Sequence, residues 1–156
     1  MGREMTRIID RLARVKEIRV KNSGIVQLQF LNDYPDGNLV IAESGRNLPF
    51  EIKRVYFIKN LANAKAVRGK HAHKKLHQVI FCINGSFILN LDDGMVKQRI
   101  LMDEPTLGIR LGPKLWHTMS HFSKDCVILV LANELFDERD YIRDYDEFLR
   151  YTCQKQ

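Results

Sequence analysis

Arg68-Gly69-Lys70-His71-Ala72-His73-Lys74-Lys75-Leu76-His77 is the stretch that decides the fold, because it places three of the five histidines within seven residues, just before an apolar run that ends at Asn84-Gly85. Alternate residues of a β-strand point to the same face, so we expect His71 and His73 to project together. His77 has the same parity and joins them if the strand continues unbroken. Two converging imidazoles can transfer protons near neutral pH, and three can hold a metal ion.

Short runs of alternating apolar and polar residues surround this stretch on both sides. Asn84-Gly85 is the strongest short hairpin signal, and Asp92-Asp93-Gly94 marks another tight turn. The expected strands are 25–30, 39–41, 54–58, 79–83, 86–91, 96–102, 108–111 and 127–132. Many short strands, with almost no helical pattern between residues 23 and 132, predict an all-β fold, either an antiparallel barrel or a sandwich.

The two ends of the chain have a different pattern. Residues 1–22 contain seven Lys/Arg and three Asp/Glu, which gives +4 of the total net charge of +6. In this basic extension a short amphipathic helix is predicted by five apolar residues at helical spacing, Met5, Ile8, Ile9, Leu12 and Val15. Near the other end, within 134–151, the spacing of Tyr141, Tyr145, Phe148 and Leu149 predicts a terminal helix laid against the barrel. We therefore expect a basic extension over 1–22 and one domain over 23–156.

Composition excludes several classes of protein. The chain is 45% hydrophobic and 28% charged, and no apolar run reaches the length of a bilayer crossing or of a signal peptide in 1–22. No nucleic-acid motif is present. Cys82, Cys126 and Cys153 lack metal-type spacing and are expected to be reduced structural residues. The composition predicts a cytoplasmic protein with neither a membrane nor a nucleic acid as a partner.

A second motif follows the histidine pair. Gly112-Pro113-Lys114-Leu115-Trp116-His117 occupies a later strand-turn segment. A His-x-His pair on one strand and a histidine from a later motif are the arrangement of the cupins, antiparallel barrels of the jelly-roll type. Cupins commonly hold a divalent metal with these residues and a glutamate, and here His77 stands where that pattern expects Glu. Ligand type permits a metal site formed by His71 and His73 with His77 or His117.

The resemblance extends to one family within the cupins. The segments that support it are 49–56 (Pro-Phe-Glu-Ile-Lys-Arg-Val-Tyr), 68–75, 112–117, 122–126 (Phe-Ser-Lys-Asp-Cys) and 140–145 (Asp-Tyr-Ile-Arg-Asp-Tyr). Together they resemble the dTDP-4-keto-6-deoxyglucose 3,4-ketoisomerases over about residues 26–151. The resemblance implies a homodimeric cupin enzyme that uses no metal or other cofactor and feeds deoxyaminosugar synthesis for surface glycans.

The resemblance implies roles for particular residues. Isomerisation removes the proton on C3 of the sugar, passes through an enediolate and returns a proton to C4, so it needs a base whose pKa lies near the working pH. We expect His73 to be this base and His71 to orient or polarise the sugar oxygens, although the two roles can be exchanged. A second imidazole, a tyrosine or an arginine would stabilise the enediolate oxygens.

Other residues are expected to bind the substrate, a dTDP-linked 4-keto-6-deoxyhexose. Arg54 and Tyr56 share one strand face and would position the sugar, while Arg68 would bind the diphosphate as a bidentate donor. Lys74 would attract the nucleotide. His117 matches the relatives that form the galacto product, whereas Asp36-Gly37 departs from the pattern of many relatives, so the galacto product is only slightly favoured.

Three alternatives remain open at this point. One is a nucleotide-sugar epimerase, in which the proton returns to carbon without migration of the carbonyl. Another is a metal-dependent cupin that uses the histidine cluster. The last is a sugar-binding cupin without proton chemistry.

Overall fold

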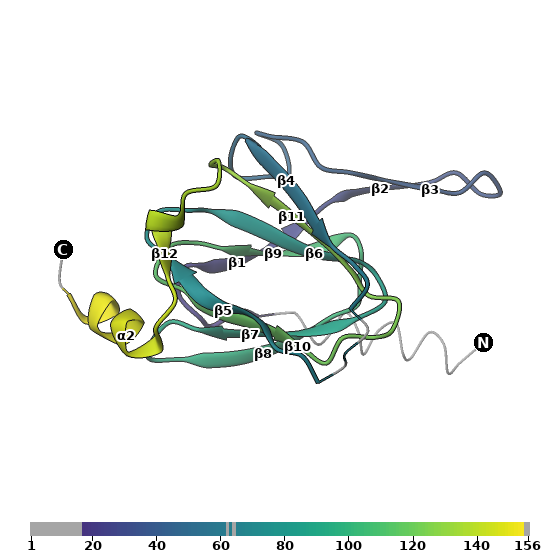
Figure 1. Ribbon diagram of the computed structural model, residues 1–156. Helices are drawn as coiled ribbons and strands as arrows, with labels where there is room; N and C mark the ends of the chain where they lie inside the picture. The colour runs from purple at the N-terminus through teal and green to yellow at the C-terminus, as the bar shows by residue number, and fades with distance from the viewer. Residues whose placement is uncertain (1–16, 62, 64, 155–156) are drawn as a thin grey trace.

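Two five-stranded antiparallel sheets face each other in the computed structural model, which describes residues 17–61, 63 and 65–154 (Figure 1). The first sheet has the order β1-β9-β6-β11-β4, formed by Ser23–Gln27, Leu107–Leu111, Gln78–Asn84, Val127–Ala132 and Arg54–Ile58. The second has the order β12-β5-β10-β7-β8, formed by Tyr141–Ile142, Arg68–His73, Trp116–Ser120, Phe87–Asp92 and Lys97–Met102. The predicted all-β cupin-type barrel is confirmed.

The main hydrophobic core fills the space between the two sheets. Phe87, Leu89 and Leu91 alternate along β7 and are fully buried, and they join Ile80 and Cys82 of β6 in the same cluster. This alternation is what the sequence pattern predicts for strands with one face toward a core. Burying each large apolar side chain stabilises the fold by about 1.5–3 kcal/mol. The core therefore holds the two sheets against each other.

The turn at Asn84-Gly85 is present, but the predicted hairpin is wrong. Gly85 has a φ of 70°, yet β6 pairs with β9 and β11 whereas β7 pairs with β8 and β10. The turn therefore moves the chain from one sheet to the other. Tertiary contacts stabilise it instead of a strand partner: Ser86 N donates to Ser123 Oγ at 2.9 Å, and Asn84 Nδ2 donates to Asp125 O at 2.8 Å.

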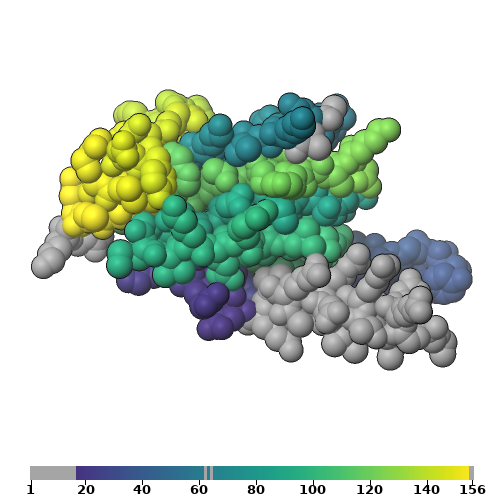
Figure 2. Space-filling view, turned by 90° about the horizontal axis from the view of Figure 1, so that it is seen from below, coloured from purple at the N-terminus to yellow at the C-terminus, as the bar shows by residue number. Residues whose placement is uncertain are grey.

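A two-stranded hairpin of β2 (Gln29–Asn32) and β3 (Asn38–Ile41) extends from the barrel at the end opposite the C-terminal helix (Figures 1 and 2). All four residues of β2 are exposed, including Phe30 and Leu31. Closer to the barrel, Leu48 is buried in a second apolar cluster with Val79 and Phe81 on the outer side of the first sheet. The hairpin thus leaves apolar side chains exposed that a barrel strand would bury.

The C-terminal helix begins later than its periodicity predicts. Helix α2 spans Tyr145–Cys153, and the Asp144 side chain caps it by accepting from Glu147 N. Before it come a short 3₁₀ helix η1 (Glu138–Asp140) and strand β12, which pairs with β5. Tyr141 was predicted to lie on the helix face and lies on a strand instead, because a neighbouring strand supplies its backbone hydrogen bonds.

The described end of the basic extension packs on the barrel. Val20 is 3% exposed and belongs to the main core, and Lys21 N donates to Asp93 Oδ2 at 2.7 Å. The residues on which the amphipathic helix was predicted lie outside the described residues, and the division at residues 22 and 23 stays a prediction. Within the described part of the chain, no helix has the length and apolar character needed to span a bilayer.

Candidate active site

The orientation of the histidine strand β5 depends on a bulge. His71 of β5 is opposite His117 of β10, but Met119 is opposite Arg68, so two residues of β5 between these pairs are matched by one of β10. Gly69 lies in this bulge with a φ of 82°, a conformation that glycine adopts without steric cost. In a regular strand, Arg68 and His71 are three positions apart and would point to opposite faces. The bulge places both of them on the wall of the same cavity.

Cross-strand pairing brings four rings together around β5. His117 is opposite His71, and Tyr141 of β12 is opposite His73. The ring centroids of His71 lie 4.8 Å from His73, 4.6 Å from His117 and 4.8 Å from Tyr141. The two strand histidines and His117 were predicted as site residues, whereas Tyr141 was not, because its pairing with β5 has no local signal in the sequence.

His77 does not join the pair. Strand β5 ends at His73, and His77 N donates to Asn133 Oδ1 at 3.0 Å beyond a bend in the chain. Lys74 lies outside the site as well, since its Nζ donates to the carbonyl oxygen of Arg139 at 3.0 Å. His71, His73 and His77, one set of histidines that ligand type permits as a metal site, therefore do not lie together.

A chain of polar contacts links the histidines to a carboxylate that is not among the predicted site residues. His71 Nε2 lies 3.1 Å from His73 Nε2, and His73 Nδ1 lies 3.0 Å from Asp140 Oδ2. The Asp140 carboxylate also accepts from Lys75 N at 2.7 Å and from Leu76 N at 3.2 Å. The side chains of His73 and Asp140 are only 4% and 15% exposed, so this contact is largely shielded from water.

Burial keeps the three clustered imidazoles neutral. Burial, with added repulsion from His117, His73 and Arg143, lowers the pKa of His71 to about 2. Burial and the neighbouring His73 lower the pKa of His117 to about 3. Burial also lowers the pKa of His73, but the charge of Asp140 and its hydrogen bond oppose that shift. Neutral imidazoles have a lone pair that can accept a proton from carbon.

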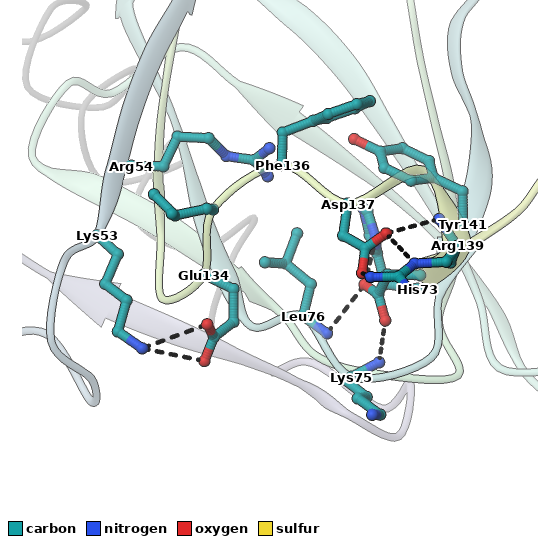
Figure 3. A pocket seen from close by; sticks show the side chains of 12 residues that line it. Lys53, Arg54, His73, Lys75, Leu76, Glu134, Phe136, Asp137, Arg139 and Tyr141 are labelled. Carbon is teal, nitrogen blue, oxygen red and sulfur yellow. Dashed lines mark hydrogen bonds and ion pairs between the residues drawn. The ribbon is translucent and has the colours of Figure 1, made fainter.

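Two cavities meet at this cluster. The inner cavity, of about 580 Å³, is lined by core residues of both sheets and by Arg54, Tyr56, Arg68, His71, His117 and Arg143. The outer cavity, of about 650 Å³, is lined by His73, Asp140 and the segment 134–137 (Figure 3). Arg54, Phe136 and Tyr141 line both cavities. His71 and His73 thus touch each other across the boundary between two spaces.

Arg54 and Tyr56 project from β4 to the same side, as their spacing predicts. The Arg54 guanidinium lies 5.4 Å from the ring centre of Tyr56 and 5.9 Å from that of Phe136. Tyr56 Oη donates to Gln78 Oε1 at 3.0 Å, and burial raises the pKa of Tyr56 to about 12. Arg54 Nε is buried without a hydrogen-bond partner among the described residues. A buried donor in that state is suited to an acceptor atom of a ligand.

No group of three or more His, Cys, Asp or Glu side chains is arranged to hold a metal ion within residues 17–61, 63 and 65–154. The three histidines nearest one another contact through their rings and through the Nε2 atoms of His71 and His73. What the cluster presents to a ligand is a set of imidazole nitrogens together with the arginine and tyrosine donors of β4.

Comparison with known proteins identifies the family. A family model described as "FdtA: WxcM-like, C-terminal" matches residues 21–153. A curated relative, the TDP-4-oxo-6-deoxy-alpha-D-glucose-3,4-oxoisomerase of Aneurinibacillus thermoaerophilus, is 51% identical over 117 residues, which cover 75% of this chain and 84% of the relative.

Solved structures agree with this assignment. A mutant of the 3,4-ketoisomerase QdtA from Thermoanaerobacterium thermosaccharolyticum, in complex with TDP-4-keto-6-deoxyglucose, is 38% identical with a TM-score of 0.82, covering 85% of this chain and 95% of that one. The TDP-quinovose 3,4-ketoisomerase WlaRB from Campylobacter jejuni is 40% identical with a TM-score of 0.79, covering 84% and 99%. The predicted resemblance is confirmed, and the chain belongs to the FdtA family of sugar-nucleotide 3,4-ketoisomerases.

Proposed function

We propose that this enzyme converts TDP-4-keto-6-deoxyglucose into a TDP-3-keto-6-deoxyhexose by proton transfer at the histidine pair. The observation that supports this most directly is the contact between two neutral imidazoles at 3.1 Å beside a cavity lined with arginine and tyrosine. The relatives named above act on, or are bound to, sugars of this kind. The products would serve the synthesis of deoxyaminosugars for surface glycans.

The reaction balances with imidazole chemistry alone. The C3–H bond breaks, its proton passes to an imidazole nitrogen, and its electron pair forms an enediolate with the former C4 carbonyl. The imidazole then returns a proton to C4, while the O3 proton is transferred in net terms to O4 and the carbonyl forms at C3. Of the two histidines, we assign the proton to His73, where Asp140 compensates its charge, and hydrogen bonding to the sugar oxygens to His71.

Substrate binding is assigned to the arginines and the tyrosine of the inner cavity. Arg54 and Tyr56 would position the sugar, and Arg68 at the edge of β5 would bind the diphosphate as a bidentate donor. His117 lies 4.6 Å from His71 between ring centroids. We favour the galacto product because His117 matches the residue expected in relatives that form it.

The homodimer and the cytoplasmic location also stay proposals. Apolar side chains exposed on the hairpin and on edge strand β4 support the dimer, among them Phe30 at 49% and Phe57 at 62% exposure. An edge strand with exposed apolar residues is a ready surface for a second copy. Light scattering on the purified protein measures its mass directly, and a monomer at micromolar concentration would contradict the dimer.

Proton NMR with TDP-4-keto-6-deoxyglucose in deuterated water tests the reaction. We expect the carbonyl to migrate to C3 and deuterium to enter at C4, and the ring couplings then report whether C4 is galacto- or gluco-configured. Exchange at C3 or C5 without migration of the carbonyl would identify an epimerase and overturn the proposal. An unchanged substrate would overturn it as well.

A further inference from the structure

The Asp140–His73–His71 chain of contacts has a definite direction of hydrogen donation. Asp140 Oδ2 already accepts from Leu76 N, and Oδ1 accepts from Lys75 N, so this carboxylate is an acceptor on every side that the structure shows. His73 Nδ1 must therefore be the donor in its 3.0 Å contact with Oδ2. A neutral His73 with its hydrogen on Nδ1 has a lone pair, and no hydrogen, on Nε2.

The same logic determines the next contact. Nε2 of His73 faces Nε2 of His71 at 3.1 Å, and one of two nitrogens at that distance must donate. Since Nε2 of His73 has no hydrogen, Nε2 of His71 donates. The pair is thus divided into an acceptor, His73, and a donor, His71, by a residue that lies behind them.

We propose that Asp140 is the positioning residue of this pair: it holds His73 in the Nδ1–H form, so that Nε2 of His73 carries no hydrogen and is the acceptor of the pair, and it compensates the positive charge that His73 bears when it takes up a proton during the reaction. The inference rests on the proposed ketoisomerase function. It also explains why the roles of the two histidines, which the sequence leaves exchangeable, differ in the folded protein.

The charged groups around His73 make its contact with Asp140 important. The other charged groups that act on it are Arg54 and Arg143, both of which disfavour a positive imidazole, and His71 and Tyr141 surround its ring. Asp140 is the group that favours the positive form, by its charge and by its hydrogen bond. Removing it would leave an imidazolium in a buried site beside two arginines, which is unfavourable.

The segment that bears Asp140 is held in place by its own contacts. Asp140 N donates to the carbonyl oxygen of Asp137 at 3.1 Å, and Lys74 N donates to the carbonyl oxygen of Asp140 at 2.9 Å. Tyr141, the next residue, pairs with His73 across β12 and β5. The backbone of Asp140 therefore stays in position when only its carboxylate is altered, so a side-chain variant tests the carboxylate itself.

The main test compares Asp140→Asn with Asp146→Asn, which makes the same charge change at an exposed residue of α2. An asparagine amide donates to Nδ1 of His73 and forces the hydrogen onto Nε2, so we expect kcat to fall by about 100-fold or more while KM stays nearly constant. We expect Asp146→Asn to retain the activity of the unaltered protein. Retention of kcat within twofold by Asp140→Asn would overturn the proposal.

Two further measurements separate positioning from a structural role. Nitrogen-15 NMR of the histidine rings in the free protein should show the His73 hydrogen on Nδ1, and on Nε2 in Asp140→Asn. Formate can enter through the outer cavity, which both His73 and Asp140 line, so we expect it to restore turnover of Asp140→Ala by about tenfold while chloride does not. An unchanged His73 tautomer, or no rescue by formate in a folded Asp140→Ala, would overturn the proposal. Because the tautomer is measured without substrate, failure of the ketoisomerase assay leaves that measurement intact.

Discussion

The inner and outer cavities differ in what builds them, although they share Arg54, Phe136 and Tyr141. Strands of both sheets form the inner cavity, and buried apolar residues such as Ile80 lie beside its histidines. The loop and 3₁₀ segment before β12 form much of the outer cavity, where exposed ion pairs join Lys53 to Glu134 and Arg139 to Asp137 (Figure 3).

The difference shows that the two sides of the site act on the charge of the imidazoles in opposite directions. The sheet side desolvates the imidazoles and keeps them neutral, because burial is the largest cause of their lowered pKa values. The loop side supplies Asp140, the carboxylate that favours a positive His73. Loops tolerate polar groups that a core cannot hold, so the charged partner of a buried histidine enters from the loop side.

The largest effect is expected from a substitution that breaks the contact between His71 and His73, at the boundary between the two cavities. His73→Asn keeps a polar side chain of smaller size but removes the imidazole, and we expect kcat to fall by about 1,000-fold. Turnover is measured by NMR, and binding of TDP by calorimetry. TDP binding should stay close to that of the unaltered protein, and a variant that still turns over at more than a tenth of the original rate would contradict the assignment.

Replacement of Arg54, which lines both cavities, tests whether their shared wall binds the substrate. Arg54→Met removes a guanidinium whose Nε has no hydrogen-bond partner in the described part of the chain. We therefore expect KM to rise by about 10- to 100-fold, the value of one charge-assisted hydrogen bond, with a smaller change in kcat. Arg46→Met is the matched control, because Arg46 is exposed and its ion pair with Glu43 lies outside both cavities. An unchanged KM for Arg54→Met would show that Arg54 only packs between two rings.

The buried histidines of the inner cavity also make the stability of the protein depend on pH. A histidine whose pKa is lower in the folded protein than its usual value near 6.5 binds a proton more readily when unfolded, so stability is lost as the pH falls below about 6.5. Each such histidine contributes a slope of up to about 1.4 kcal/mol per pH unit in that range. Urea unfolding between pH 7.5 and 5 measures the slope, and His117→Asn should make it shallower. An identical slope in His117→Asn would contradict the effect of burial on this residue.

The smallest effect is expected at the outer cavity's exposed ion pair. Lys53→Met removes a contact of 3.2 Å between side chains that are 45% and 53% exposed, and water already screens such pairs. We expect the free energy of unfolding to change by about 0.5 kcal/mol or less and turnover to change by less than about twofold. A tenfold loss of turnover would show that the outer cavity binds the substrate directly.

Much of the architecture follows from local sequence. The alternating pattern of β7 indicated its buried face, and Asp92-Asp93-Gly94 marks a real hairpin between β7 and β8. The Asn84-Gly85 turn was also located correctly, but its partner strands were not. Turn chemistry determines that the chain bends, whereas the sheet that the next strand joins depends on distant residues such as Ser123.

The histidine pair illustrates the same division at the site. The sequence by itself determined that His71 and His73 share a strand face and that Arg54 and Tyr56 share another, because side-chain direction alternates along a strand. Only the tertiary structure decided that His77 stays apart, that a bulge at Gly69 turns Arg68 toward the cavity, and that Tyr141 and Asp140 meet His73. Those contacts join residues as many as 68 positions apart, from Tyr141 to His73, and such pairing depends on the packing of the whole barrel, which no local pattern contains.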